Sequence, residues 1–221
     1  MQLFPDSSPS SPSRDPREGA VGEVVESSTR QFVAEVSRDA RPPAFGAWVE
    51  VEVESGERLY ALVSHIETGS LEPGRRAVAL GMGRDELRRE MPQLQELIRT
   101  TFRAQVLAYR EASRGGQAGR LRQTLPPLPP SLHDFVRPAP ADAVAALHDP
   151  EGQFDYLRTL ARHPDPAVPA DDLIAAAIRQ AHEAYGRGER GQEVLVAAGR
   201  ALARLLNDDH ERLQSILRRV E

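Results

Sequence analysis

The stretch Val21-Gly22-Glu23-Val24-Val25-Glu26-Ser27-Ser28-Thr29 opens a run of strand-type sequence that continues to Gly81. Apolar and other residues alternate over 47–53, which predicts a half-buried strand. The turn Glu54-Ser55-Gly56-Glu57 leads into a mostly apolar run from Leu59 to Ile66. The two strands form a predicted hairpin, and the second strand is expected to be buried on both faces.

Further strands extend this pattern into a small barrel. Residues 32–36 and 101–110 each place apolar side chains on one face, and a short strand is predicted from Arg76 to Leu80. Between them, residues 84–98 carry a helical stripe that Pro92 divides into two short helices. The barrel therefore closes only after a helical insert. Periodicity alone does not choose among an OB, an SH3-like or another small barrel.

Glycine and proline dominate residues 112–140, which predicts a linker. Its segment Leu125-Pro-Pro-Leu-Pro-Pro130 is expected to be extended polyproline II. This segment satisfies the minimal pattern of an SH3-type ligand, but we interpret it as a stiff connector. Residues 141–221 hold amphipathic segments separated by short loops, which predicts a compact antiparallel helical bundle.

The expected fold is therefore α+β. A small antiparallel β-barrel occupies residues 20–111 and contains the helical insert at 84–98, and a C-terminal helical bundle follows the linker. Residues 1–19 are rich in serine and proline with little to bury, and we expect a disordered tail.

Composition excludes several kinds of chemistry. The chain has 221 residues and no cysteine, and all 28 basic residues are arginine. Without lysine there is no standard P-loop and no Schiff base, and without cysteine there is no thiol nucleophile or cysteine zinc site. The fragments His133-Asp134 and Asp208-Asp209-His210-Glu211 do not combine with a nucleophile and an oxyanion hole. We expect a non-enzymatic protein with no cofactor and no metal.

The same composition bears on location. No apolar run approaches the roughly 20 residues that span a bilayer. The N-terminal segment is polar, unlike a secretory signal peptide. We expect a cytoplasmic protein without membrane insertion.

Four segments of the barrel region share the features of a known domain: Val21-Gly22-x-Val24, Phe32, Gly46-x-Trp48-Val49 and Leu62-Val63-Ser64-His65-Ile66. They resemble the HAS-barrel, named for the HerA-type DNA translocases and the ATP synthase head subunits that share it. Ala61 stands where that family often has glycine.

The order of segments along the whole chain is similar to that of short HAS-barrel proteins of cyanobacteria. The similarity covers roughly residues 20–220. The segments that carry it are Pro43-Ala-Phe-Gly-Ala-Trp48, Arg99-Thr-Thr-Phe-Arg103, Leu125-Pro-Pro-Leu-Pro-Pro130, Phe154-Asp-Tyr-Leu-Arg-Thr-Leu160 and Asn207-Asp-Asp-His-Glu-Arg-Leu213.

This resemblance implies a binding surface on exposed loops and edge strands, because in ring ATPases the barrel packs against other barrels or docks a partner. The best candidate is the loop from Arg41 to Trp48, where an exposed Phe45 or Trp48 would anchor an interface. The alternative is that Trp48 covers the end of the barrel.

Charge is unevenly distributed along the chain. Residues 20–73 hold ten acidic residues and four arginines, whereas residues 74–122 hold eleven arginines and five acidic residues. The arginines of the basic segment would contact phosphate or an acidic partner, or they form a solvated face. The candidates are Arg75, Arg76, Arg84, Arg88 and Arg89.

Three hypotheses for function follow. The first is a non-enzymatic protein-interaction or assembly module, a HAS-type barrel without its ATPase motor, which binds a ring ATPase or a second copy of itself. The second is a nucleic-acid accessory factor that uses the arginine-rich segment 74–122. The third is an enzyme of unrecognised type.

Overall fold

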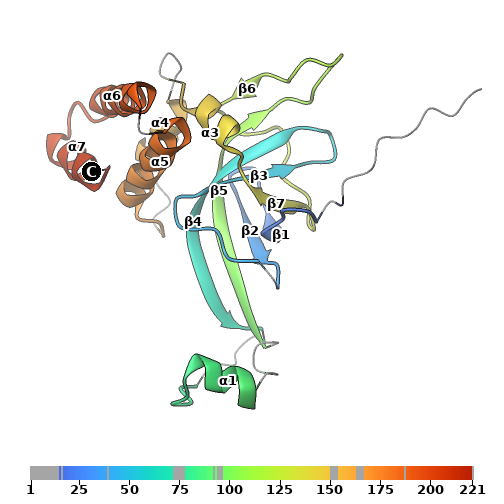
Figure 1. Ribbon diagram of the computed structural model, residues 1–221. Helices are drawn as coiled ribbons and strands as arrows, with labels where there is room; N and C mark the ends of the chain where they lie inside the picture. The colour runs from blue at the N-terminus through green and yellow to red at the C-terminus, as the bar shows by residue number, and fades with distance from the viewer. Residues whose placement is uncertain are drawn as a thin grey trace, which may run out of the picture.

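The computed structural model describes residue 15 and residues 17–38, 40–71, 78–91, 93, 97–149, 154–162, 167–186 and 188–220. Within these residues, a closed antiparallel barrel carries helices on one side (Figure 1). Its strands run in the order β2-β1-β7-β3-β4-β5, and β2 pairs with β5 to close it. The barrel strands are β1 (Gly22–Ser27), β2 (Gln31–Val36), β3 (Trp48–Glu52), β4 (Arg58–Ser70), β5 (Ile98–Arg110) and β7 (Phe135–Pro138).

The hairpin predicted around residues 54–57 is confirmed, because β3 and β4 pair from Trp48 with Leu62 to Glu52 with Arg58. The barrel interior is filled by aliphatic side chains and two phenylalanines, as the alternating pattern requires. These interior residues are Val24, Phe32, Ala34, Val49, Val51, Val53, Leu59, Ala61, Val63, Phe102, Ala104, Val106 and Val136.

The first half of β4, from Leu59 to Ser64, is buried on both faces, as the apolar run predicts, whereas the strand is exposed or partly exposed from His65 onward. Leu59 and Ala61 point into the barrel, whereas Tyr60 and Leu62 belong to a second apolar core outside it. Successive side chains of this part of β4 thus alternate between the two cores, as in a regular strand. The outer face of β4 therefore has to be covered by another part of the chain.

The C-terminal helices supply that cover. They are α3 (Ala141–Leu147), α4 (Asp155–Arg162), α5 (Ala170–Tyr185), α6 (Glu189–Leu205) and α7 (His210–Val220). Helix α5 lies at their centre and contacts α3, α4, α6 and α7. Side chains of these helices, such as Leu157 and Ile178, share one core with Trp48, Tyr60 and Leu62 of the barrel wall. The α+β fold with a barrel is confirmed.

The structure differs from the expected linker at residues 112–140. Strand β7 lies within that range and completes the barrel between β1 and β3. A further two-residue strand, β6 (Leu121–Arg122), pairs with the end of β5. Burial of Pro126 and Pro130 and a bend at residues 127–128 show that the proline segment is neither straight nor free of the body.

The helical insert is carried on an arm, and the second short helix predicted from Pro92 lies mostly outside the described residues. Helix α1 (Arg84–Glu90) lies within the predicted 84–98, but Ile98 already belongs to β5. Residues 78–80 form no strand, which corrects that part of the predicted strand; Arg76 lies outside the described residues. Instead β4 and β5 continue as a two-stranded arm, pairing as far as Ser70 with Ile98. Figure 1 shows α1 at the far end of this arm.

Gly46, in the loop before β3, lies directly against helix α5. Its φ is +78°, and a Cβ built there would lie 2.2 Å from Cβ of Ala176. A side chain is therefore excluded both by the backbone and by the neighbouring helix.

Replacing Gly46 by alanine should lower the free energy of unfolding by about 2–4 kcal/mol, from left-handed backbone strain and overpacking together. Gly199→Ala is the matched control, because Gly199 lies in α6 with open space around it. That control should be neutral or more stable by about 0.5–1 kcal/mol. Urea unfolding of both variants measures the difference, and an unchanged stability for Gly46→Ala would contradict this account of the junction.

Candidate functional site

The loop from Arg41 to Trp48 is exposed over most of its first five residues and becomes buried at Gly46 and Trp48. Trp48 begins β3 and is only 3% exposed, between the outer wall of the barrel and the helices. The backbone before it is tied to β4, since the Gly46 amide donates to the Val63 carbonyl at 2.8 Å. Phe45 keeps partial exposure. The structure therefore offers Phe45, but not Trp48, to a partner.

Trp48 belongs to a buried aromatic cluster. Its ring meets His148 edge-on at 5.5 Å between centroids and Tyr156 at 5.4 Å, and His148 and Tyr156 are 5.2 Å apart. Phe154 packs obliquely beside His148. Near-perpendicular rings at these spacings are favourable contacts for aromatic quadrupoles. The cluster thus joins β3, the end of α3 and the start of α4.

His148 and Tyr156 are fully buried in this cluster. Burial lowers the pKa of His148 from 6.5 to about 4, although its bond to the Val144 carbonyl opposes the shift. Burial also raises the pKa of the Tyr156 phenol. Both groups are therefore neutral near pH 7.

Of the five predicted arginines, Arg89 is the one whose side chain the structure describes. Helix α1 contains Arg84, Arg88 and Arg89, and Arg89 donates to the Asp85 carbonyl within that helix. Arg75 and Arg76 lie outside the described residues.

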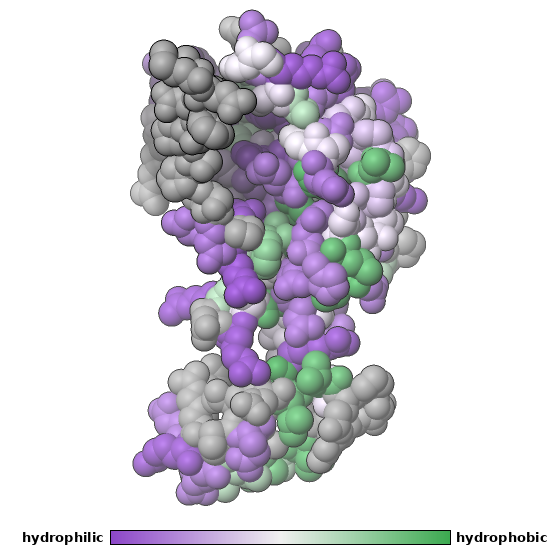
Figure 2. Space-filling view, turned by 90° about the vertical axis from the view of Figure 1, so that its right-hand side faces the viewer, coloured by the Kyte–Doolittle hydropathy of each residue, from purple (hydrophilic) through white to green (hydrophobic). Residues whose placement is uncertain are grey.

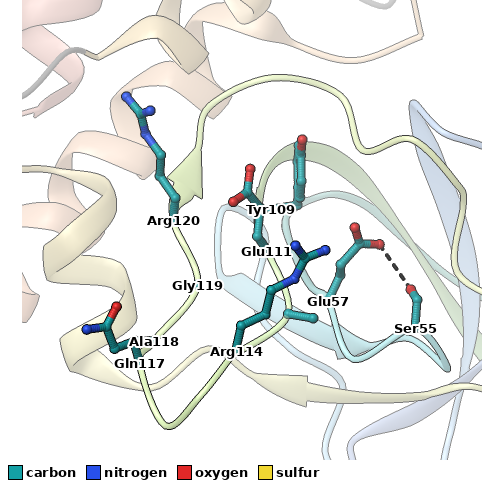
Figure 3. A pocket seen from close by; sticks show the side chains of 10 residues that line it. Ser55, Glu57, Tyr109, Glu111, Arg114, Gln117, Ala118, Gly119 and Arg120 are labelled. Atoms are coloured by element: carbon teal, nitrogen blue, oxygen red, sulfur yellow. Dashed lines mark hydrogen bonds between the residues drawn. The ribbon is translucent and has the colours of Figure 1, made fainter.

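Two hollows lie at the hairpin end of the barrel. The first, of about 620 Å³, is bounded by the β3–β4 turn and the β5–β6 hairpin. Figure 3 shows Glu57, Glu111 and Arg114 among its lining side chains, with the hydrogen bond between Ser55 and Glu57. Glu111 is also the partner of Arg122 at 2.6 Å. This pair lies on the surface, since the two side chains are 42% and 41% exposed, and the described residues of the hollow form no nucleophile–base arrangement.

The second hollow, of about 990 Å³, is predominantly acidic. It holds Glu50, whose side chain is 12% exposed and lies 3.8 Å from Arg58, which also pairs with Glu52 at 3.0 Å. Burial raises the pKa of Glu50, although Arg58 and Arg137 oppose the shift. Burial likewise raises the pKa of Asp134, against the opposing bond from the Ser131 amide.

The fragments that resembled acid–base sites are dispersed. His133 contacts Glu23 at 2.5 Å on the surface beside the acidic hollow. Asp209 accepts a bond from the Arg212 amide at the start of α7, which is a helix-capping role. In the described part of the chain, no group of three or more histidine or acidic side chains is arranged to hold a metal ion. Nor does any described helix combine the length and apolar character needed to cross a bilayer.

The described residues at the tip of the β4–β5 arm expose several large apolar side chains. Val78 is 78% exposed there, and hydrophobic side chains gather on the lower lobe in Figure 2. The exposed residues at the tip are Leu71, Val78, Leu80 and Ile98. An exposed apolar group of this kind is typical of an interaction surface.

Nothing in the sequence singles out His148, Tyr156 or the arm tip. Tyr156 was visible as a helix residue, but its meeting with Trp48 depends on tertiary packing. His148 follows α3 and precedes Asp149, so its burial has no local signal. At the arm tip, Val78 and Leu80 are apolar and fit a buried strand, so the sequence does not show that they are exposed.

Stability should depend on pH through His148. Because its folded pKa lies below the unfolded value, the unfolded chain binds the proton more readily between pH 6.5 and pH 4. The free energy of unfolding should fall by about 3 kcal/mol as the pH drops through this window. Above pH 6.5 the stabilising contribution of the neutral His148 is fully present.

His148→Asn should remove most of this dependence, because asparagine does not titrate there. Glu50 and Asp134 act in the opposite direction, since their raised pKa values favour proton binding by the folded chain. The change in the free energy of unfolding with pH is therefore compared between variants. His65→Asn, at an exposed histidine, is the matched control. Chemical unfolding at pH 7 and pH 5 measures this change. If His148→Asn and the parent lose the same free energy of unfolding between the two pH values, the role of His148 is refuted.

Comparison of the chain with protein-family models and with curated proteins gave no match. The HAS-barrel resemblance therefore depends on the segments quoted above, and the functional interpretation depends on the geometry of the described residues.

Proposed function

We propose that the protein is a non-enzymatic interaction or assembly module, built on a HAS-type barrel without a motor domain. Its helices form a bundle that serves the barrel as a fixed support. The partner is another protein, either a ring ATPase or a second copy of this chain. The observation that carries the proposal is the apolar tip of the β4–β5 arm.

The barrel supports the family part of this proposal. Val21-Gly22-x-Val24 leads into β1 and Gly46-x-Trp48-Val49 leads into β3, as the resemblance implies for strand starts. At Gly22 an added Cβ would lie 2.6 Å from the Glu35 carbonyl oxygen, so the glycine permits close pairing with β2. In both motifs the glycine is therefore explained by the lack of space for a side chain.

The arm supports the functional part. Its tip presents four large apolar side chains to solvent, while the outward apolar side chains of β3, β4 and β5, such as Trp48 and Leu62, are covered by the helices. Exposed apolar residues scattered singly need no explanation, but a group at the end of a projecting element favours binding to another protein.

Nucleic-acid binding has less support. Several arginines of segment 74–122 bond within the chain: Arg99 lies 4.0 Å from Glu35, Arg110 donates to the Gly119 carbonyl, and Arg122 pairs with Glu111. Such pairing lowers the charge available to phosphates.

The absence of native cysteine allows a clean test. Val78→Cys and Val196→Cys each provide one thiol for a photo-crosslinker, on the arm tip and on an exposed position of α6. Crosslinking in the native cytoplasm should give one discrete product from position 78 and none from position 196. Unlabelled parent protein should compete this product away.

The competitor carrying Val78→Ser and Leu80→Ser should fail to compete. A matched competitor with Val196→Ser and Leu217→Ser, which also removes an exposed valine and an exposed leucine, should compete like the parent. Thermal unfolding of both should stay within about 0.5 kcal/mol of the parent, because the side chains are exposed. Equal crosslinking from both positions, or equal competition by both variants, would refute the arm as the binding surface.

A further inference from the structure

Apart from Met1, the methionines of the chain are Met82 and Met91, and both lie at the tip of the β4–β5 arm. Met82 comes directly before Gly83, the N-cap of α1, and Met91 is the C-cap of the same helix. Both residues are partly buried, so they keep contact with solvent. The chain has no cysteine, so these two thioethers are the sulfur groups through which an oxidant acts on the tip.

Helix α1 depends on local interactions. It has seven residues, and among the described residues it makes no extended contact with another helix or strand. Figure 1 shows it at the far end of the arm, away from the barrel and the other helices. A helix of this length is marginal in water by itself. Two bonds close its ends: the Gly83 amide donates to the Glu86 carboxylate at 3.3 Å, and the Met91 amide donates to the Leu87 carbonyl at 2.9 Å.

Apolar side chains provide the remaining local support for α1. Met82 lies just before the N-cap and Leu87 is the fourth helical residue, and side chains at these two positions typically pack together as a hydrophobic staple. Met91 follows one turn after Leu87. These three residues are partly buried, whereas Asp85 and Glu86 between them are exposed. The apolar side of this short helix is thus built around two thioethers.

We propose that oxidation of Met82 and Met91 to methionine sulfoxide is a switch that weakens binding at the arm tip. In each step hydrogen peroxide transfers one oxygen atom to the sulfur. The O–O bond breaks, an S–O bond forms, and the second oxygen leaves as water. The sulfur is oxidised and the peroxide is reduced. This inference rests on the proposed function, because it concerns the surface assigned there to the partner.

The physical consequence of oxidation is a change of polarity. Methionine sulfoxide is polar, so its burial in the apolar part of the tip becomes unfavourable. Because α1 has no extended contact with the body to hold it, losing its apolar side should unwind it. The exposed Val78 and Leu80 lie just before this helix, so the apolar surface offered to the partner should lose its fixed arrangement. Methionine sulfoxide reductases reverse the reaction, so the switch can be reset.

The first measurement needs no partner. Parent protein treated with hydrogen peroxide should gain oxygen at positions 82 and 91, which peptide mass spectrometry locates. The NMR Cα chemical shifts of residues 84–90 should then move toward random-coil values, while those of α7, which contains no methionine, should stay unchanged. The variant carrying Met82→Leu and Met91→Leu is the matched control, because leucine is apolar, similar in volume and not oxidised by peroxide. The treated control should keep its α1 shifts.

The second measurement uses the crosslinking competition with the Val78→Cys probe. Before treatment, the parent and the double-leucine variant should compete equally. After treatment and removal of peroxide, about tenfold more oxidised parent should be needed for the same competition, whereas the treated double-leucine variant should compete as before. Incubation with a methionine sulfoxide reductase should restore competition by the oxidised parent.

Unchanged α1 shifts after oxidation of both methionines would overturn the inference, and so would equal competition by the parent before and after treatment. The same loss in the treated double-leucine variant would also overturn it, because the damage would then lie elsewhere in the chain. If the untreated parent does not compete, the arm is not the binding surface and the proposed function itself fails. The α1 shifts then show separately whether oxidation unwinds the helix.

Discussion

The architecture depends on covering the outer wall of the barrel. Tyr60, Leu62 and Trp48 are directed away from the barrel interior, and each is almost completely removed from solvent by the helices. Burial of a large apolar side chain contributes about 1.5–3 kcal/mol, so this wall is a substantial part of the stability. Without the helices, the barrel would expose a broad apolar surface. The barrel and the helices are therefore two sides of one fold rather than independent units.

That constraint also explains the arrangement of the connecting segment. The chain has to leave β5, supply β7 between β1 and β3, and then begin α3 above the wall. The segment is anchored on the way, because Ser27 donates to the Pro130 carbonyl and Gln123 bonds both the Leu147 carbonyl and the Tyr156 amide. Proline is suited to such a route, since its restricted φ reduces the entropy lost on ordering. The path is fixed by contacts at both ends.

Local patterns predicted the parts of the fold that depend on local physics. Alternation over residues 47–53 and the apolar run after residue 58 identified the hairpin, and the alternation over 101–110 identified the returning strand β5. The sequence does not predict β7, because its four residues, which end at Pro138, carry too little periodicity. Trp48 could not be assigned to core or interface, because its neighbours Glu50 and Glu52 on the same face are partly exposed while Trp48 lies under the helices. The cluster of Trp48, His148 and Tyr156 joins residues 108 positions apart along the chain, and no sequence window contains it.

The continuity of β4 sets a length scale for whatever the tip of the arm engages. The same strand that lies beneath the helices at Tyr60 ends at Ser70 in the arm. At about 3.3 Å per residue, those ten steps span roughly 30 Å along the strand. The hydrogen-bonded ladder with β5 stiffens this span. A partner bound at the tip would therefore be held at a defined distance from the C-terminal helices. The arm then acts as a spacer as well as a contact surface.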